Sequence, residues 1–228
     1  MGDLAETLAE ELECQVAFTI PIGNGIPIYE SVVVTWIIMA VLVIFAFCMT
    51  RNLKVHNISK RQAFIEMVVT KLTGMVEGML PSKGRKYVPY LTTVLLYIGI
   101  ANIIGIFGFK SPTKDLSVTA ALALMSIILV EAAGIYHLGI KKWLHKFVEP
   151  VAVVTPINIL EVATKPLSLC MRLFGNVIGA FVIMKLLEAV VPYVLPAVFS
   201  CYFDIFDGLL QAYVFVFLTS LYISEAIE

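Results

Sequence analysis

Long apolar runs separated by short polar segments make up most of the chain. Residues 31–50 carry no charged side chain, and about 20 apolar residues suffice to cross the hydrocarbon core of a bilayer. Further apolar runs cover residues 87–109 and 116–140, and two longer runs cover 157–191 and 195–226. Because polar and apolar positions do not alternate with the period of a strand, we expect helices and not a barrel. The pattern predicts an all-α, polytopic membrane protein with about five membrane helices.

The two terminal apolar runs are too long for upright spans. As helices, residues 157–191 and 195–226 would be about 52 Å and about 48 Å long, whereas an upright span needs about 30 Å. A tilt of about 20° does not absorb this excess. Pro192 and Pro196 bracket the connection between the two runs. We therefore predict a long hairpin over residues 155–227 whose helices are strongly tilted or project from the membrane.

Residues 59–80 have a different pattern, in which apolar positions recur along one helical face. Ser59, with Gln62 three residues later, forms a candidate capping box at the start of this helix. An amphipathic helix of this kind can lie flat in the membrane interface, and it can equally pack against a partner. A basic turn at residues 81–86 follows it. We predict an amphipathic interfacial helix, with both settings left open.

Charge is sparse and uneven, and its distribution orients the predicted helices. Only 14% of the residues are charged, where a soluble domain is nearer a quarter. Residues 1–30 contain six acidic side chains and no lysine or arginine, while residues 51–86 contain eight lysines and arginines. Because such positive charge marks cytoplasmic segments, we expect residues 1–30 to form an acidic external tail that dips towards the membrane at residues 16–22. Five crossings then put the C-terminus in the cytoplasm.

Several classes of function lack any support in the sequence. No basic patch with interleaved aromatic residues suggests nucleic-acid binding. The four cysteines have no metal-ligand spacing, and no phosphate-binding loop, zinc motif or nucleophile–base arrangement is present. We therefore expect a lipid bilayer as a partner, no nucleic acid, no cofactor, no metal site and no catalytic site.

A polar stripe interrupts the first run of the long hairpin. Glu161, Lys165, Ser168, Arg172 and Asn176 follow one another in steps of three or four residues, which places them on one helical face. An arginine at membrane depth costs at least about 2.5 kcal/mol and is a functional hypothesis by default. Arginine also keeps its proton at physiological pH. We predict a functional site along this face, with an ordinary ion pair between Glu161 and Lys165 as the alternative for its first two members.

The second apolar run of the hairpin carries polar residues about as far from the turn as those of the first run. Gln211 would lie about as far from the hairpin turn as Arg172, so that the two face each other in mid-membrane. Nearer the turn, acids from both helices would surround Lys185. Burying an isolated carboxylate costs free energy, so this cluster predicts a hydrated vestibule around the acids. The alternative is that these side chains only reach the water of the lipid headgroups at the turn. The candidate ion-path residues near the turn and on the second helix are Glu188, Asp204, Asp207, Gln211 and Tyr222.

The predicted hairpin over residues 87–140 supplies three further candidates. Asn102 is expected to hydrogen-bond to a neighbouring helix, with a water-lined path as the alternative. Glu131 lies within an apolar run and is either an ion-path residue or the partner of a cation. Asp115, in the loop between the two apolar runs, completes the candidate set.

Several motifs resemble one family. The segment from Lys165 to Asn176, KPLSLCMRLFGN, is similar to the arginine signature of subunit a of rotary F-type ATP synthases. Residues 101–105, 112–119 and 210–215 resemble other segments of that family, in the family's order. The resemblance covers roughly residues 87–228.

The resemblance implies a non-catalytic stator subunit with two laterally offset aqueous half-channels for H⁺ or Na⁺. Ions would board and leave a rotor ring of subunit c, and this flow would be coupled to rotation and ATP synthesis. Further implied partners are the peripheral-stalk subunit b and other synthase subunits. The implied location is a bacterial plasma membrane, with an organellar inner or thylakoid membrane as the alternative. The last hairpin would lie nearly horizontal around the ring.

Two positions depart from the family pattern. Some members carry an acid nine residues after the arginine, where this chain has Phe181, and position 204 is aspartate where others carry histidine or glycine. We expect the acid to be relocated to Asp204, Asp207 or Glu188. A stand-alone channel or secondary transporter is the alternative function, but it would predict internal repeats, and none is visible. A non-conducting scaffold does not explain Arg172.

Overall fold

The computed structural model describes residues 16–21, 26–51, 53, 59–107, 111–146, 155–190 and 199–227. This part of the chain is almost entirely helical, which confirms the all-α class. In chain order the elements are β1 (Val16–Ile20), β2 (Ile26–Tyr29), α2 (Glu30–Thr50), α3 (Lys60–Glu77), η1 (Ser82–Tyr87), α4 (Val88–Ile103), η2 (Ile104–Phe107), η3 (Pro112–Lys114), α5 (Leu116–Leu138), α6 (Ile140–Lys146), α7 (Thr155–Val190), η5 (Cys201–Asp207) and α9 (Gly208–Ile227).

Helix lengths agree with the predicted membrane class. Within the described part of the chain, four helical segments are long and apolar enough to cross a membrane, namely α2, α5, α7 and the continuous stretch of η5 with α9. The remaining predicted crossing is α4, which has 16 residues. A fifth crossing therefore stays a prediction.

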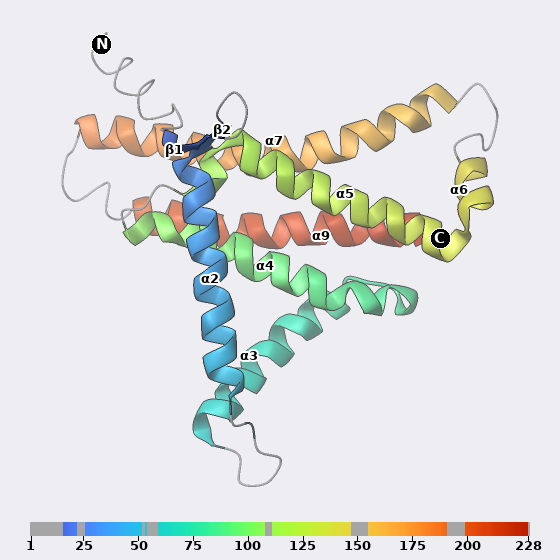
Figure 1. Ribbon diagram of the computed structural model, residues 1–228, viewed down its shortest axis with the longest axis horizontal. Coiled ribbons are helices and arrows are strands. Elements are labelled where there is room, and N and C mark those ends of the chain that lie inside the picture. Colours follow the sequence, from blue (N-terminus) through green and yellow to red (C-terminus); the bar gives the residue numbers. More distant parts are fainter. Residues whose placement is uncertain are drawn as a thin grey trace.

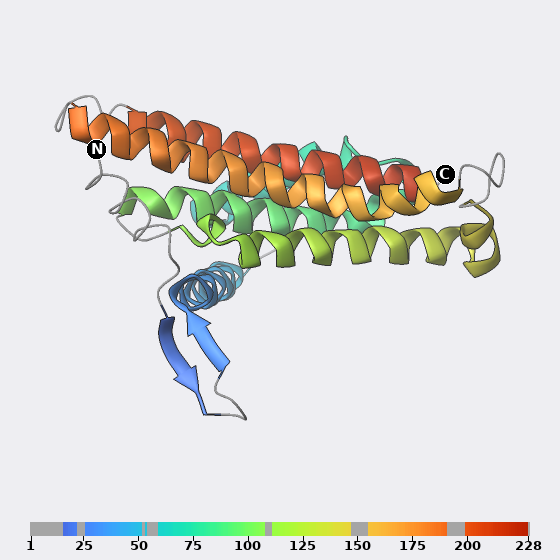
Figure 2. The same cartoon turned by 90° about the horizontal axis from the view of Figure 1, so that it is seen from above.

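Helices α4, α5, α7 and α9 lie alongside one another and form the body of the protein (Figures 1 and 2). Helix α9 packs against both α4 and α5, and α7 packs against α5 and α9. The shared core is apolar, as expected where helices face one another and not lipid. Its largest fully buried side chains include Leu91, Ile98, Leu173, Phe215 and Ile223.

Helix α2 crosses this body steeply and contacts it only near one end (Figure 1). There, Val34 and Ile38 are buried, and the Tyr97 hydroxyl donates a hydrogen bond to Thr35 Oγ1 at 3.3 Å. Along the rest of α2 the exposed side chains are large and apolar, such as Val43 and Phe47, both 68% exposed. Such a surface suits the hydrocarbon region of a bilayer.

The segment before α2 forms a small β-hairpin, which the sequence reasoning missed. Strands β1 and β2 pair antiparallel, with Val16 opposite Tyr29 and Thr19 opposite Pro27. We expected an acidic external tail that dips towards the membrane at residues 16–22, and did not predict strands there. The signal was available, because two short β-prone runs flank a segment rich in glycine. Residues 1–15 of the predicted tail lie outside the described residues.

Helix α3 is the predicted amphipathic helix, slightly shorter than residues 59–80. Its start is confirmed, because Ser59 Oγ accepts a hydrogen bond from the Gln62 backbone N–H at 3.3 Å. The basic turn after it is held back against the helix by an Arg85–Glu77 ion pair of 2.8 Å. Apolar side chains such as Phe64 remain exposed on α3. Its setting in a membrane interface stays a prediction.

The long terminal hairpin begins with one helix of 36 residues, α7, which continues through Pro166. The return helix α9 is preceded by the π-helical segment η5, which the sequence did not predict. Helix α7 and the continuous stretch of η5 with α9, Cys201–Ile227, are therefore both longer than an upright span, as predicted. The predicted turn, with Pro192 and Pro196, lies outside the described residues.

Candidate functional site

The polar stripe on α7 points partly out of the helical body. Arg172 and Ser168 are exposed, whereas the adjacent Leu169 and Leu173 are buried against the other helices. Among the residues that the structure describes, Arg172 has no hydrogen-bond or ion-pair partner. Its positive charge is therefore presented outwards and is not neutralised by a neighbouring acid.

One turn further along α7, the stripe connects to α9. The Asn176 side-chain amide donates a hydrogen bond to Gln211 Oε1 at 2.6 Å. Gln211 is only 2% exposed, and its buried Nε2 has no partner among the described residues. We expected Gln211 to face Arg172. Its direct partner is Asn176, the next member of the same stripe.

A cavity of about 330 Å³ opens beside this pair, towards the hairpin-turn end of α7 and α9. It brings together the three acids predicted for a vestibule, Glu188, Asp204 and Asp207. Ser200 Oγ donates to Asp204 Oδ2 at 2.6 Å, and Lys185 Nζ lies 3.4 Å from Glu188 Oε2. The π-helical turns of η5 present both aspartates, and π-helical turns are frequent at functional sites.

The same cavity contains Lys114, a second cation that the sequence reasoning did not assign to it. Its ammonium lies 3.8 Å from the centre of the Phe181 ring, a cation–π contact. Phe181 is the position at which the family resemblance had led us to expect an acid in some members. The only sequence signal for Lys114 was its place in the loop before α5, because nothing in the sequence indicates that this loop reaches α7.

Asn102 links α4 to both α9 and the loop before α5. Its Nδ2 donates to the Gly208 carbonyl at 2.9 Å, which confirms the predicted bond to a neighbouring helix. Its Oδ1 accepts from Thr113 Oγ1 at 2.8 Å. A Cβ added at Gly208 would lie 2.9 Å from Asn102 Cβ. Glycine is therefore required where these two helices meet.

Asp115 has structural partners and lines neither of the two cavities described here. Its Oδ1 accepts from the Ser117 backbone N–H at 2.8 Å and so caps α5. Its other carboxylate oxygen accepts a hydrogen bond from Ser31 at the start of α2. The side chain thereby fastens α2 to α5.

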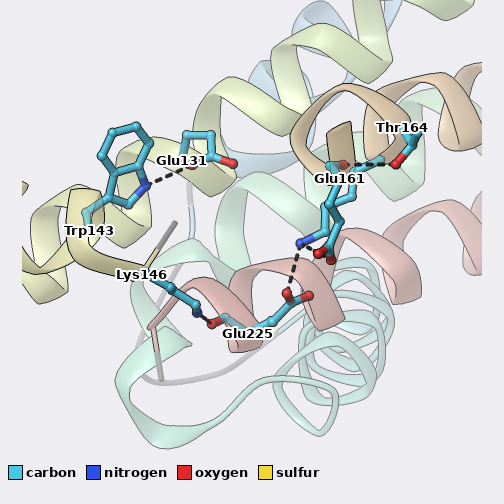
Figure 3. Close-up of polar contacts among 7 residues, drawn as sticks. Glu131, Trp143, Lys146, Glu161, Thr164 and Glu225 are labelled. Carbon is cyan, nitrogen blue, oxygen red and sulfur yellow. Dashed lines mark hydrogen bonds and ion pairs between the residues drawn. The ribbon is translucent and has the colours of Figure 1, made fainter. Parts of the chain in front are cut away.

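A second cavity, of about 460 Å³, lies at the opposite end of the α7–α9 pair, where α5 and α6 complete its lining. Lys165 Nζ bridges two acids there, 3.1 Å from Glu161 and 2.9 Å from Glu225 (Figure 3). The Glu161–Lys165 pairing that we held as the simpler alternative is thus present. The Lys165 ammonium also lies 5.3 Å from the centre of the Tyr222 ring.

Glu131, on α5, lines the same cavity. Its Oε2 accepts a hydrogen bond from the indole N–H of Trp143 at 2.9 Å (Figure 3). Trp143 belongs to the short helix α6 and was not among the predicted site residues. Its sequence signal was weak, because a single tryptophan near a basic segment is typical of a membrane interface.

The two cavities and Arg172 have a simple spatial order along α7. Lys165 lines one cavity and Val177 the other, and the helix between them is about 18 Å long at about 1.5 Å per residue. Arg172 lies on this intervening stretch and lines neither of these cavities.

Comparison with known proteins shows the family to which the chain belongs. The model of the family described as ATP synthase A chain matches residues 32–224. The chain belongs to the ATP synthase A chain family. The chain is similar to ATP synthase subunit a of Moorella thermoacetica, with 37% identity over 89% of this chain and 93% of that relative.

Two further relatives extend the family assignment. ATP synthase subunit a 1 of Crocosphaera subtropica is 32% identical over 87% of this chain and 86% of its own length. A sodium-ion-specific ATP synthase subunit a of Propionigenium modestum is also 32% identical, over 89% of this chain and 75% of its own length. As a family member with long apolar helices, this chain is a membrane component of an ATP synthase.

Proposed function

We propose that this stator subunit conducts H⁺, or Na⁺, through two offset aqueous half-channels at its contact with a rotor ring of subunit c. Ion flow through them drives rotation and is thereby coupled to ATP synthesis elsewhere in the complex, and the chain itself is non-catalytic. The observation that carries the proposal is the order of the features along α7. Two charged cavities lie at opposite ends of the α7–α9 pair, and Arg172 lies between them.

The positive charge of Arg172 explains, in this proposal, why ions do not pass directly between the half-channels. A permanent positive charge between the half-channels repels a cation that would cross directly, and it attracts an ionised carboxylate on the ring. At about 4 Å and an effective dielectric of about 20, that attraction is about 4 kcal/mol. One charge crossing 100 mV gains about 2.3 kcal/mol. Water must therefore moderate the attraction.

The outward face of α7 fits an apolar helical partner. Around Arg172, large apolar side chains are exposed, including Leu167, Met171, Ile183 and Leu186. A ring of membrane helices would cover these side chains and present its ion-carrying carboxylates to the guanidinium. This is the contact that rotation requires, because the stripe can interact with each ring subunit in turn.

The charge distribution supports placing the two cavities on opposite sides of the membrane in this proposal. The cavity with Lys165 lies near the basic helix α6, which carries Lys141, Lys142 and Lys146, and it therefore opens to the cytoplasm. The cavity with Asp204 opens to the outside. The N-terminal segment lies on that same side in this proposal. The membrane is a bacterial plasma membrane in this proposal, with an organellar inner or thylakoid membrane as the alternative, and subunit b is a further partner.

The test is reconstitution of the purified chain in lipid vesicles, with and without the c-ring. Dye-monitored ion flux should require the ring, since ions cross by riding on it. Flux through the chain alone, at the rate seen with the ring, would identify a stand-alone channel or transporter.

A further inference from the structure

Glu131 differs from the other acids of the cytoplasmic cavity in its hydrogen-bond partner. Glu161 and Glu225 both contact the ammonium of Lys165. Glu131 contacts the neutral indole of Trp143, and it has no cationic partner among the described residues. Binding a proton at either of the first two acids disrupts an ion pair. Binding a proton at Glu131 disrupts none.

The indole suits both protonation states of Glu131. Trp143 donates to Oε2 only, so Oε1 is left for a proton, and in Figure 3 that oxygen points away from the indole. An indole N–H is a donor and never an acceptor. It can therefore bond Oε2 as a carboxylate oxygen or as the carbonyl oxygen of the neutral acid. The contact holds the side chain in place while its charge changes.

We propose that Glu131 is the proton acceptor of the cytoplasmic half-channel and that Trp143 is its positioning residue. In the synthesis direction, a ring carboxylic acid releases its proton to water in the cavity, and Glu131 Oε1 takes up that proton. The O–H bond then breaks, the proton leaves to cytoplasmic water, and the carboxylate is restored. In the pumping direction the same transfers run backwards. The proposal rests on the proposed ion path.

The ion in this proposal is a proton and not sodium. One free carboxylate oxygen is enough to bind a proton, whereas a hard metal cation needs several oxygen ligands at once. The other charged groups that line the cavity hold one another in place, because Lys165 joins two of them and Lys146 donates to the Glu225 backbone carbonyl. The charged groups that face Glu131 from the neighbouring helices are Lys146, Glu161, Lys165 and Glu225.

The experiment uses the complete synthase in inverted vesicles, whose cytoplasmic face meets the bath. Glu131→Gln keeps an oxygen for the indole but cannot carry the proton. ATP-driven pumping and proton-driven synthesis should both fall about tenfold, a modest loss for proton transfer because water can partly substitute. Passive leak should not rise. A leak would instead mark a failure of the Arg172 barrier, so the two proposals fail in different ways.

The matched control is Glu66→Gln on α3, outside both cavities. Glu66 Oε1 likewise accepts a side-chain hydrogen bond from a neutral donor, Gln62, at 2.7 Å, and its rates should not change. Trp143→Phe keeps a ring and loses the donor, so pumping should slow and its dependence on bath pH should change. An unchanged pH profile in Trp143→Phe would refute the positioning role.

Glu131→His provides a second test, which can still be made if the complex with Glu131→Gln assembles poorly. Histidine ordinarily titrates at higher pH than glutamate, so the bath-pH profile of pumping should move to higher pH. Normal rates in Glu131→Gln, or an unshifted profile in Glu131→His, would make Glu131 only a hydrogen-bond partner of the indole. Pumping that depends on bath sodium and not on pH would also overturn the assignment.

Discussion

Asn176 on α7 donates a hydrogen bond from its side-chain amide to Gln211 Oε1 on α9 at 2.6 Å, beside the cavity that Gln211 lines together with Asp204. Arg172 lies one helical turn from this bond and has no such partner among the described residues. The two helices are therefore joined beside the arginine and not through it. In the proposed function, this leaves the guanidinium to interact with the rotor.

Replacing Arg172 should uncouple the enzyme. We expect Arg172→Ala to abolish coupled ATP synthesis and to introduce a passive leak, because the barrier between the half-channels is lost. Arg172→Lys should not restore synthesis, since a lysine in an apolar setting loses its proton more easily and lacks the planar fork of donors. Synthesis is assayed in vesicles with the complete complex, and leak after removal of the catalytic head.

Glu66→Gln serves as the control for assembly and vesicle tightness. Normal synthesis without added leak in Arg172→Ala vesicles would contradict the proposed mechanism. Arg172 would then have only a structural role.

Gln211 should be able to carry the charge in place of Arg172. Gln211 is buried beside the stripe, and its Nε2 lacks a partner among the described residues. We expect Arg172→Gln with Gln211→Arg to block passive ions better than Arg172→Gln alone, as measured by dye-monitored leak with the ring present. Equal leak in the single and double variants would show that the position on α7 itself is essential.

The acids of the external cavity, the one that contains Asp204, should promote ion uptake. Combining Glu188→Gln, Asp204→Asn and Asp207→Asn removes the carboxylates that line it, so ion-driven ATP synthesis should slow while the complex still assembles. Rates are measured across a range of external pH. Unchanged rates throughout would make these residues solvated side chains near the turn, as the alternative sequence interpretation had it.

The Asn102–Gly208 contact should be a stability determinant. Asn102→Ala leaves the buried Gly208 carbonyl and Thr113 hydroxyl without this partner, which should cost about 1–3 kcal/mol. Gly208→Ala should also destabilise, because its Cβ would lie 2.9 Å from Asn102 Cβ. Thermal dissociation of the complex gives the measurement. Gly74→Ala is the control, since its Cβ would meet nothing within 4 Å.

The proposed sides of the membrane can be tested for the β-hairpin and for α6. In a background without native cysteines, Phe18→Cys on the β-hairpin and Lys142→Cys on α6 should react with impermeant thiol reagents from opposite sides. In the proposed topology, three crossings, by α2, α4 and α5, separate the two positions. Labelling of both from the same side would refute the proposed odd number of crossings.

The sequence predicted the helices well and the connections between them poorly. Apolar runs report burial or lipid contact directly, so the long helices followed from hydropathy, and helical spacing grouped Arg172 with Asn176. Lys114 and Trp143 were missed because their roles depend on where a loop and a short helix fold back. The π-helical turns of η5 were missed because their backbone pattern carries no distinctive residue. The cap that Asp115 forms on α5 is local, whereas its bond to Ser31 on α2 is a tertiary contact that the sequence does not show.

The bridge made by Lys165 has a mechanical consequence. Lys165 ties α7 to α9 through Glu225, and Asn176 ties them again through Gln211, about 16 Å further along the helix. Arg172 lies between these two contacts, so that α7 is held against α9 on both sides of the arginine. Torque from a turning rotor would therefore pass through α7 into α9, whose buried Phe215 and Ile223 anchor it in the body of the protein. Loosening either contact would let α7 flex under load, so that part of each rotary step would be dissipated before it reached the catalytic head.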